Sequence, residues 1–280
     1  MNFGKKKIKI FILILVITIF TISLQTSKPI YNNVLLQELK KENNRFIAHA
    51  SGGIDSHKYT NSNEGISNSI KNGFKFIEID LLETKDQIFV GVHDWKSFKE
   101  KTNYMNKNLK LSDPILYNEF KKLKIYNKYH PLDIDEINNI FLKNKNLYLV
   151  IDKTKNFKKI KNDLKFDQDR ILVEIIGKDN FFQALKDEIK NPIYNYDPGD
   201  YKFILKNKIK IITTSMRNIL ENQDEFQELI NKEIFVFAYS SNNEEFIKNN
   251  IGKLFTQVYT DFWDINKLKC TIKKDLCSTY

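Results

Sequence analysis

The sequence contains little glycine, proline or cysteine: 9, 5 and 2 residues, respectively, in a chain of 280. Fibrous and low-complexity chains are rich in glycine or proline, so this composition argues against both classes. Hydrophobic residues make up 41% of the chain and charged residues 29%, a balance typical of a folded domain. A single core of this size is ordinary for an α/β barrel. We therefore expect one large globular domain.

The two cysteines, Cys270 and Cys277, both lie near the C-terminus. In an oxidising compartment they could close a small loop. The alternative is two free thiols on a terminal segment, and the sequence leaves both open. Neither cysteine follows an expected strand, so we expect no catalytic role for cysteine.

The sequence also lacks the charge pattern of a nucleic-acid-binding protein. The net charge is +10, and the four lysines at positions 5, 6, 7 and 9 contribute part of it, leaving +6. The remaining lysines are scattered among acidic residues, without a basic helix or an alternation of basic and aromatic residues. We therefore expect no nucleic-acid partner. A mild attraction to anionic membrane surfaces or anionic polymers fits the charge.

The N-terminal lysines precede a hydrophobic segment. Residues 10–24 are continuously apolar or hydroxylic, and the uncharged stretch continues to Ser27. A basic patch before such a run is typical of an export signal, and the run is just long enough for a membrane anchor. We expect an exported protein. Residues 1–27 are either retained as a membrane anchor, the alternative we favour, or cleaved as a signal peptide to give a secreted protein. Residues 28–44 would form a linker and first helix, followed by the main domain at 45–280.

Apolar runs alternate with helical patterns beyond residue 45. The strand candidates are residues 46–48, 74–82, 88–93, 147–151, 171–176, 192–196, 209–213, 234–239 and 255–259. Helical stretches such as 181–189, 219–230 and 244–249 lie between most of them. This alternation predicts an α/β fold with a mainly parallel sheet and helical crossovers.

The number of strand candidates exceeds the eight strands of a closed barrel by one. The gap between 74–82 and 88–93 is too short for a helical crossover. Either these two strands are joined in another way, or a weak candidate such as 192–196 is not a barrel strand. The polar segment 95–145 is inserted between two strands, and in a barrel we expect it over the active-site face.

Two carboxylates stand two residues apart in one expected strand. The side chains of Glu78 and Asp80 must point to the same face, because side chains alternate along a strand. Like charges side by side are tolerated only with a shared cation or proton. Ile77 and Ile79 imply that the opposite face is buried too, which argues against a surface pair on an edge strand. The pair therefore indicates a divalent metal.

Other reactive side chains follow neighbouring strands. His49 ends one apolar strand, His93 ends another, and Asp152 ends a third, followed by Lys153. Reactive groups in (β/α) barrels gather at the carboxyl ends of the strands, so we expect these residues near Asp80. Three acids suit a hard cation with oxygen ligands, Mg²⁺ or Ca²⁺, and the histidines are better placed for proton transfer than for binding zinc.

In this order, the motifs resemble those of the glycerophosphodiester phosphodiesterase family, barrel enzymes similar to phosphatidylinositol phospholipase C. The family shows a strand-end His-Arg-Gly, a Glu-Asn-Thr, a Glu-x-Asp, a His-Asp, a Glu-x-Lys and a closing Thr-Asp strand. The corresponding residues here are His49, Thr60-Asn61-Ser62, Glu78-x-Asp80, His93-Asp94, Asp152 and Thr260-Asp261. The resemblance covers about residues 45–262.

The resemblance implies a (β/α)8 barrel of the TIM type that hydrolyses phosphodiesters with one divalent cation. By this similarity, Glu78, Asp80 and Asp152 would bind the metal, and His49 and His93 would be the acid–base pair. Asn61, in the family's Glu-Asn-Thr position, would help to bind the substrate.

The chain departs from the family pattern at several positions. Ala50 replaces the usual Arg, Thr60 replaces the Glu, and Thr154 stands where the Lys of Glu-x-Lys is expected. The third acid is Asp152 rather than Glu, a choice that also resembles the sphingomyelinase D-type phospholipases. These departures affect the choice of substrate more than the reaction.

The positive charge that these departures remove could be replaced locally. Lys153 or Lys155 could supply an ammonium group near the phosphate. The backbone at Gly52 and Gly53 could approach a phosphate closely, since glycine has no side chain to hold it away.

These features predict metal-dependent phosphodiester hydrolysis at the cell surface or outside the cell. One histidine would deprotonate water or a neighbouring substrate hydroxyl, and the other would protonate the leaving alkoxide; we assign His93 as the base and His49 as the acid. The diester could be a glycerophosphodiester, a lysophospholipid or a glycerol-phosphate polymer. A degenerate barrel that only binds phosphorylated ligands, and a metal-independent lyase in which a basic residue replaces the cation, are the alternatives. The intact acid cluster argues against both.

Overall fold

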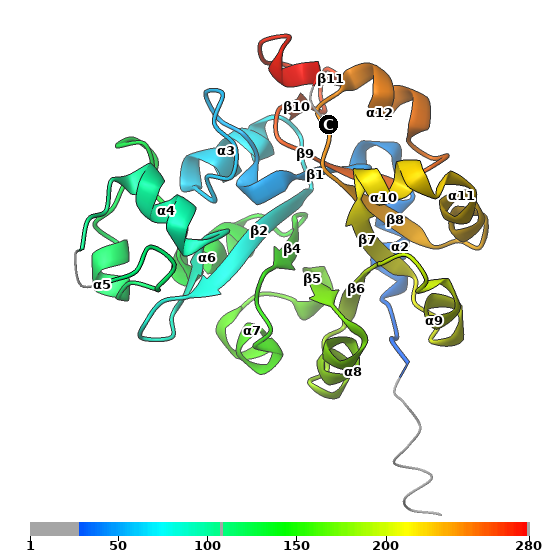
Figure 1. The fold of residues 1–280 in the computed structure, drawn as a ribbon, viewed down its shortest axis with the longest axis horizontal. Helices are drawn as coiled ribbons and strands as arrows, with labels where there is room; N and C mark the ends of the chain where they lie inside the picture. Colours follow the sequence, from blue (N-terminus) through cyan, green and yellow to red (C-terminus); the bar gives the residue numbers. More distant parts are fainter. Residues whose placement is uncertain (1–27, 107–108, 279–280) are drawn as a thin grey trace, which may run out of the picture.

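Eight parallel strands close into a barrel in the computed structural model, which describes residues 28–106 and 109–278 (Figure 1). The strands are β1 (Phe46–Ala48), β2 (Phe76–Glu83), β4 (Tyr148–Asp152), β5 (Ile171–Ile176), β6 (Asn191–Asn195), β7 (Ile211–Ser215), β8 (Phe235–Tyr239) and β9 (Gln257–Thr260). Each pairs in parallel with the next, and β1 pairs with both β2 and β9, which closes the ring. The predicted (β/α)8 barrel is confirmed.

A ninth strand explains the surplus candidate. β3 (Phe89–Gly91) pairs antiparallel with the end of β2, with Leu81 opposite Gly91. An antiparallel neighbour needs only a short turn, which fits the gap that is too short for a helix. The suggestion that 192–196 is not a barrel strand is wrong, because this segment forms most of β6.

Helices cover the outside of the barrel. They are α3 (Asn63–Lys71), α6 (Ile134–Lys143), α7 (Phe157–Asp163), α8 (Lys178–Lys186), α9 (Tyr201–Lys206), α10 (Met216–Glu221), α11 (Gln223–Asn231) and α12 (Glu244–Asn250), with 3-10 turns at Glu42–Asn44, His49–Ser51, Gln168–Arg170 and Leu276–Ser278. The buried face of each helix follows from the spacing of apolar residues in its sequence. In α6, for example, Ile134, Ile137 and Phe141 recur on one buried face. Asp133 begins the helix by accepting a hydrogen bond from the Glu136 N–H group.

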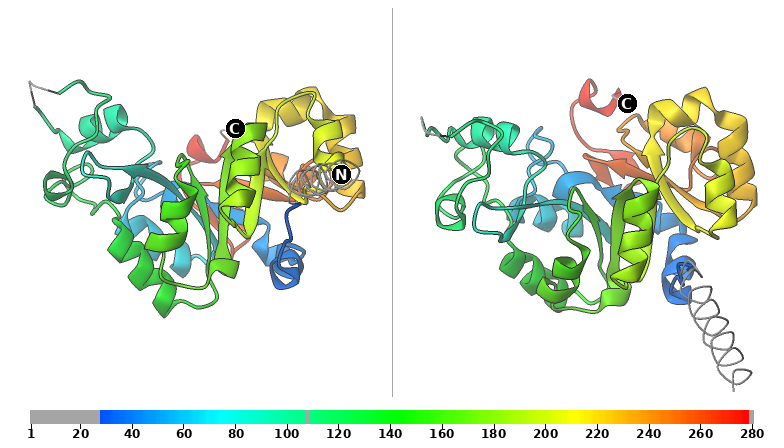
Figure 2. Two further views of the ribbon diagram at one scale, coloured as in Figure 1. Left: turned by 90° about the horizontal axis from the view of Figure 1, so that it is seen from below. Right: turned by 60° about the horizontal axis from the view of Figure 1, so that its bottom comes forward.

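A helix at the other end of the barrel closes its interior. α2 (Asn33–Leu39) places Leu35 and Leu39 in the same hydrophobic cluster as Phe76, Phe235 and the other inward-facing residues near the strand starts. The Tyr31 hydroxyl donates to the Pro192 carbonyl oxygen at 3.0 Å. Residues 28–44, expected to be a linker and first helix, therefore plug the amino-terminal mouth of the barrel (Figure 2).

The segment after β3 forms a subdomain with its own core. Residues 95–130, called the insertion below, contain α4 (Trp95–Thr102) and α5 (Tyr117–Phe120). Trp95, Phe98, Phe120 and their neighbours form a cluster separate from the main core. The insertion is shorter than the predicted 95–145, because the buried face of α6 packs in the main core. Figure 1 shows it standing out from one side of the barrel.

The chain ends in a small two-stranded sheet and a disulfide. β10 (Trp263–Asp264) pairs with β11 (Lys269–Cys270), and Cys270 is bonded to Cys277. The predicted membrane segment, residues 1–27, lies outside the described residues. Within the described ranges, no helix is both long and apolar enough to span a bilayer.

Candidate active site

Alternation along the strands sends a set of polar side chains into one mouth of the barrel. Phe76 faces the barrel interior, so Glu78 and Asp80, which follow at intervals of two, face it as well. The same alternation places His49 after Ile47. It also places Asp152 after Val150, Glu174 after Leu172, Asn195 after Ile193, Tyr239 after Phe237 and Asp261 after Tyr259. The interior is therefore apolar near the strand starts and polar at their carboxyl ends.

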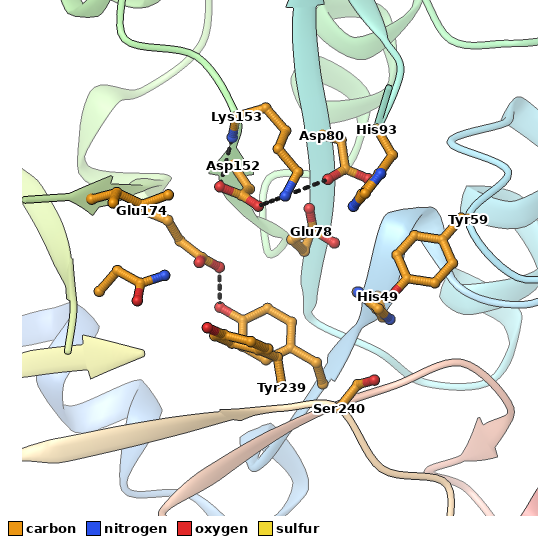
Figure 3. Close-up of a pocket in the computed structure, with 13 residues that line it drawn as sticks. His49, Tyr59, Glu78, Asp80, His93, Asp152, Lys153, Glu174, Tyr239 and Ser240 are labelled. Atoms are coloured by element: carbon orange, nitrogen blue, oxygen red, sulfur yellow. Dashed lines mark hydrogen bonds and ion pairs between the residues drawn. The ribbon is translucent and has the colours of Figure 1, made fainter. Parts of the chain in front are cut away.

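These side chains surround a pocket of about 250 Å³. Figure 3 shows His49 and Tyr59 on one side of the pocket and Glu174 on the opposite side, with Glu78 between them. The lining residues are His49, Tyr59, Glu78, Asp80, His93, Asp152, Lys153, Glu174, Ile176, Asn195, Tyr239, Ser240 and Tyr259. The structure thus brings together both predicted histidines, all three predicted acids and Lys153.

The Glu78 carboxylate is buried and only half satisfied. Its Oε2 accepts a hydrogen bond from the Ala50 backbone N–H at 2.6 Å, whereas its Oε1 is buried and has no hydrogen-bond partner. Burial, and then the charge of Asp80, raise the pKa of Glu78 well above its ordinary value. An unpartnered buried carboxylate oxygen costs free energy unless a proton or a cation is supplied.

Asp80 is held in place by Asn61. The Asn61 amide donates to Asp80 Oδ2 at 2.8 Å, and its oxygen accepts the Asp80 backbone N–H at 3.1 Å. Burial raises the pKa of Asp80, an effect opposed by nearby His93. Asn61 does not line the pocket, so its contact here is with the predicted metal ligand rather than with the space for substrate.

Lys153 is the cation within the acid cluster. Its ammonium group lies 2.7 Å from Asp152 Oδ2 and 4.0 Å from Asp80 Oδ1. Burial lowers the pKa of Lys153, but the Asp152 carboxylate outweighs burial, and the pKa lies above its ordinary value. The backbone of Lys153 is left-handed, with φ of +74°, a conformation that costs about 1–2 kcal/mol for a residue with a Cβ. This turn directs the side chain back over the strand ends.

Each pocket histidine has a carboxylate at its Nδ1 atom. His49 Nδ1 lies 3.1 Å from Asp261 Oδ1, and His93 Nδ1 lies 3.0 Å from Asp94 Oδ2. Such a contact fixes the ring and its tautomer and leaves Nε2 for the pocket. Burial raises the pKa of Asp261, but hydrogen bonds from His49 and Asn242 outweigh it and hold the pKa below its ordinary value.

Tyr59 separates the two histidines. Its ring centroid lies 4.5 Å from that of His49 and 5.0 Å from that of His93, in edge-on contact with both. Burial raises the pKa of Tyr59 to about 12, so the hydroxyl stays protonated at neutral pH. Tyr59 has φ of +53°, and the Lys101 ammonium of the insertion donates to its carbonyl oxygen at 2.9 Å.

A fourth acid faces the pocket from β5. The Tyr259 hydroxyl donates to Glu174 Oε1 at 2.5 Å, and both side chains are buried. Burial, and then the charge of Asp152, raise the pKa of Glu174 well above its ordinary value. Glu174 was not among the predicted site residues, although an acid inside the apolar run 171–176 is the same signal that identified Glu78.

The two predicted glycines lie away from the pocket. The Gly52 N–H donates to the His49 carbonyl oxygen at 2.7 Å, and the Gly53 N–H to the Asp261 carbonyl oxygen at 2.6 Å. A Cβ at Gly53 would lie 2.2 Å from the Phe262 ring. Neither glycine lines the pocket or offers a free N–H group. Glycine is needed here for close packing, and the role of Gly52 and Gly53 in substrate binding stays a prediction that the geometry does not favour.

The pocket fits a cation, although it is not arranged around one. Among residues 28–106 and 109–278, no three acidic, histidine or cysteine side chains already converge on a metal position. The unpartnered oxygen of Glu78, together with Asp80 and Asp152, nevertheless offers the hard oxygen donors that Mg²⁺ and Ca²⁺ prefer. Lys153 would have to leave Asp152 to admit the ion.

Comparison with solved structures shows the same fold. A glycerophosphodiester phosphodiesterase from Parabacteroides distasonis matches with a TM-score of 0.62 and 16% identity, over 79% of this chain and 94% of that one. One from Thermotoga maritima matches with a TM-score of 0.58 and 17% identity, over 80% and 96%. An Oleispira antarctica phosphodiesterase in complex with the product sn-glycerol-3-phosphate matches with a TM-score of 0.60 and 17% identity, over 79% and 94%.

No protein-family model and no curated protein matches the sequence itself. At these identities the structural neighbours establish the barrel fold, and they are proteins of the kind that the sequence motifs resemble.

Proposed function

We propose that this protein is a phosphoric diester hydrolase similar to the glycerophosphodiester phosphodiesterases. The observation that carries the proposal is the convergence of His49 and His93, each hydrogen-bonded to a carboxylate, on the pocket that also holds four acids and a lysine. The fold neighbours named as glycerophosphodiester phosphodiesterases support the same reaction class.

The two histidines would move the protons of the reaction. His93 Nε2 takes a proton from water or from a neighbouring substrate hydroxyl, whose oxygen attacks phosphorus. The bond from phosphorus to the leaving alcohol breaks, and His49 Nε2 gives that alkoxide a proton. Attack by water yields a phosphomonoester, whereas attack by a substrate hydroxyl yields a cyclic phosphate.

The different surroundings of the two histidines support this assignment. The Asp261 side chain is 1% exposed, so its anion opposite His49 Nδ1 stabilises the positive charge that the imidazole carries while it holds the proton to be donated. His93 and Asp94 are 39% and 44% exposed, which suits a base that meets the incoming nucleophile.

One divalent cation, Mg²⁺ or Ca²⁺, would bind to Glu78, Asp80 and Asp152. When bound, it would polarise a phosphate oxygen and offset the charge that grows in the transition state. Asn61 would keep Asp80 oriented. Lys153 would contact the phosphate in place of the family's lysine, whose position is occupied here by Thr154. The substrate class would be glycerophosphodiesters, lysophospholipids or glycerol-phosphate polymers, outside the cell and near the membrane that residues 1–27 would enter.

A chelation experiment tests the metal. We expect activity on glycerophosphodiesters to disappear in excess EDTA and to return with Mg²⁺ or Ca²⁺, because the acids need a cation both to coexist and to polarise phosphate. Released alcohol and cyclic phosphate are measured across a panel of diesters. Full activity of metal-stripped protein in EDTA would contradict the metal role.

The position of Lys153 favours a second candidate, metal-independent cleavage. Its ammonium already neutralises Asp152 and lies near Asp80, where a cation would sit. In that case EDTA would leave the wild type active, and Lys153→Ala would remove the activity. In the metal-dependent case, Lys153→Ala weakens the reaction but leaves it dependent on the metal.

A further inference from the structure

The positive charge of the described domain is concentrated on the insertion. Residues 95–130 contain nine lysines and three acidic residues, a net charge of +6. In the rest of the chain after residue 27, 32 basic residues balance 32 acidic ones. The expectation that the remaining lysines are scattered among acidic residues is therefore wrong for this segment.

Most of these lysines lie on the surface of the insertion. Its exposed described lysines are Lys96, Lys110, Lys121, Lys122, Lys124 and Lys128. Lys121 pairs with Asp133, and Lys128 with Asp55. The other four form no ion pair with a carboxylate in the described ranges, so their charge is directed to solvent.

Two further lysines fix the insertion beside the pocket. The Lys99 ammonium donates to the Lys110 carbonyl oxygen at 2.8 Å and ties α4 to the following turn. The Lys101 ammonium donates to the carbonyl oxygen of Tyr59, whose ring contacts both pocket histidines. The insertion also begins directly after His93 and Asp94. Its basic surface is therefore attached to the wall of the pocket.

We propose that the insertion binds a polyanionic chain of repeated phosphodiesters and guides it into the pocket. This inference rests on the proposed hydrolase function and names its substrate class as polymeric. Each repeat of such a chain carries a negative charge, so several repeats meet the basic surface at once, whereas a small diester meets it with one. A surface of one sign beside a cleft raises association rates by about 10- to 1,000-fold.

The arrangement of the molecule favours a polymer over a bilayer. The chain enters the described domain through Tyr31 and α2, at the amino-terminal mouth of the barrel (Figure 2). The pocket and the start of the insertion lie at the carboxyl ends of the strands. An anchor in residues 1–27 would hold this pocket away from its own membrane. Exposed Met105, Leu111 and Leu116 are the features a bilayer would use, so vesicles form one arm of the test.

The test removes charge from the insertion without touching the pocket. In one variant Lys110, Lys122 and Lys124 are changed to Gln; Lys96 is kept because it lies next to the site. The matched control changes Lys202, Lys206 and Lys208 of the α9 region, which are equally exposed. Poly(glycerol phosphate) and glycerophosphoglycerol are compared as substrates at low and high salt, and binding of the polymer is measured by calorimetry.

We expect kcat/KM for the polymer to fall about tenfold or more in the insertion variant at low salt. Turnover of glycerophosphoglycerol should be unchanged, and the control should behave like the wild type. High salt should remove the difference, because charges more than about 10 Å apart are screened at 0.1 M. Equal losses on both substrates, or no loss on the polymer, would overturn the inference while leaving the hydrolase function intact.

Two further outcomes distinguish a polymer site from a membrane site and from failure of the proposed function. If anionic phosphatidylglycerol vesicles bind the wild type and not the insertion variant, while polymer binding is the same in both, the surface is a membrane site and the inference is wrong. If the wild type cleaves neither substrate, the proposed function fails. In that case the inference is tested by calorimetry alone: the insertion variant should bind the polymer more weakly than the control does, and equal affinities would overturn the inference.

Discussion

The two histidines at the pocket are held by carboxylates of different character. Asp261 is buried and also accepts from Asn242 at 2.7 Å, so it cannot easily move away from His49. Asp94 is partly exposed and begins helix α4 as well, accepting the Ser97 N–H at 2.8 Å. The Asp261 carboxylate is thus buried and shared between His49, Asn242 and the Lys58 ammonium 3.3 Å away, whereas the Asp94 carboxylate is partly exposed and shared between His93 and a helix end.

Loss of either histidine should stop turnover without unfolding the protein. We expect His49→Ala and His93→Ala each to lower kcat by about 100-fold or more, the usual scale for a general acid or base. His130→Ala is the control, because His130 is exposed and contacts Glu64, away from the pocket. The measurements are kcat on a glycerophosphodiester and the circular dichroism spectrum. An essential His130 with a dispensable His93 would contradict the assignment.

The ionisation of Asp94 should also make the stability of the folded protein depend on pH in acid. Burial raises its pKa, but hydrogen bonds from Ser97 and His93 lower it more, from 3.8 to about 2. A depressed pKa stabilises the folded state above the unfolded value, and this stability is lost as the pH falls from about 4 to about 2. Because the side chain is 44% exposed, we expect no more than about 1 kcal/mol.

Asp94→Asn isolates this contribution, since asparagine can still cap α4 but does not titrate. Urea unfolding should show a less stable variant at pH 5 and equal stabilities near pH 2. A difference between the two proteins that stays constant over this range would show that Asp94 does not titrate in this way.

At the level of strands and helices, the sequence predicted those features that depend on neighbours in the chain. Apolar runs identified all the barrel strands, and the interval of two between Glu78 and Asp80 predicted their common face. The antiparallel direction of β3 could be predicted only in part. The short turn before Phe89 excludes a helical crossover, but it does not determine which strand β3 pairs with.

Contacts between distant segments were harder to predict. Asp261 belongs to a recognised Thr-Asp motif, but its contact with His49 joins residues 212 positions apart, and barrel closure alone creates it. Gly52 and Gly53 suggested a phosphate loop, because local sequence shows that a backbone is accessible but not that Phe262 fills the space beside it. The pairing of Cys270 with Cys277 was left open for a similar reason.

The disulfide joins the end of β11 to the last turn, across a separation of only 7 residues. A loop this short stabilises by about 2–3 kcal/mol at most in the chain-entropy model, and a terminal segment gains less. We expect the double variant Cys270→Ser, Cys277→Ser to change Tm slightly and kcat not at all. Mass spectrometry of the native protein should show the mass of the reduced form less its two thiol hydrogens. A large loss of kcat would mean that the tail acts on the pocket.

At the scale of the whole molecule, the two ends of the barrel differ in chemical character. The carboxyl ends of the strands hold the acids, the histidines and the start of the insertion, and the apolar face of α2 closes the opposite mouth. Figures 1 and 2 show the insertion and α2 in separate parts of the molecule. The pocket residues and the helix that closes the barrel thus lie at opposite ends of the barrel axis. Changes at the plug should therefore alter stability without altering the chemistry of the pocket.

Leu35 tests this separation, because its side chain is 1% exposed inside the plugged mouth, among residues such as Phe76 and Phe235. Leu35→Ala removes buried methyl groups and leaves a cavity, which costs about 2–5 kcal/mol. Val34, its neighbour in α2, is 63% exposed, so Val34→Ala is the matched control and should cost almost nothing. Urea unfolding gives the free energies, and kcat below the transition should be unchanged in both variants. Equal stabilities for the two variants would show that the apolar face of α2 does not stabilise the barrel.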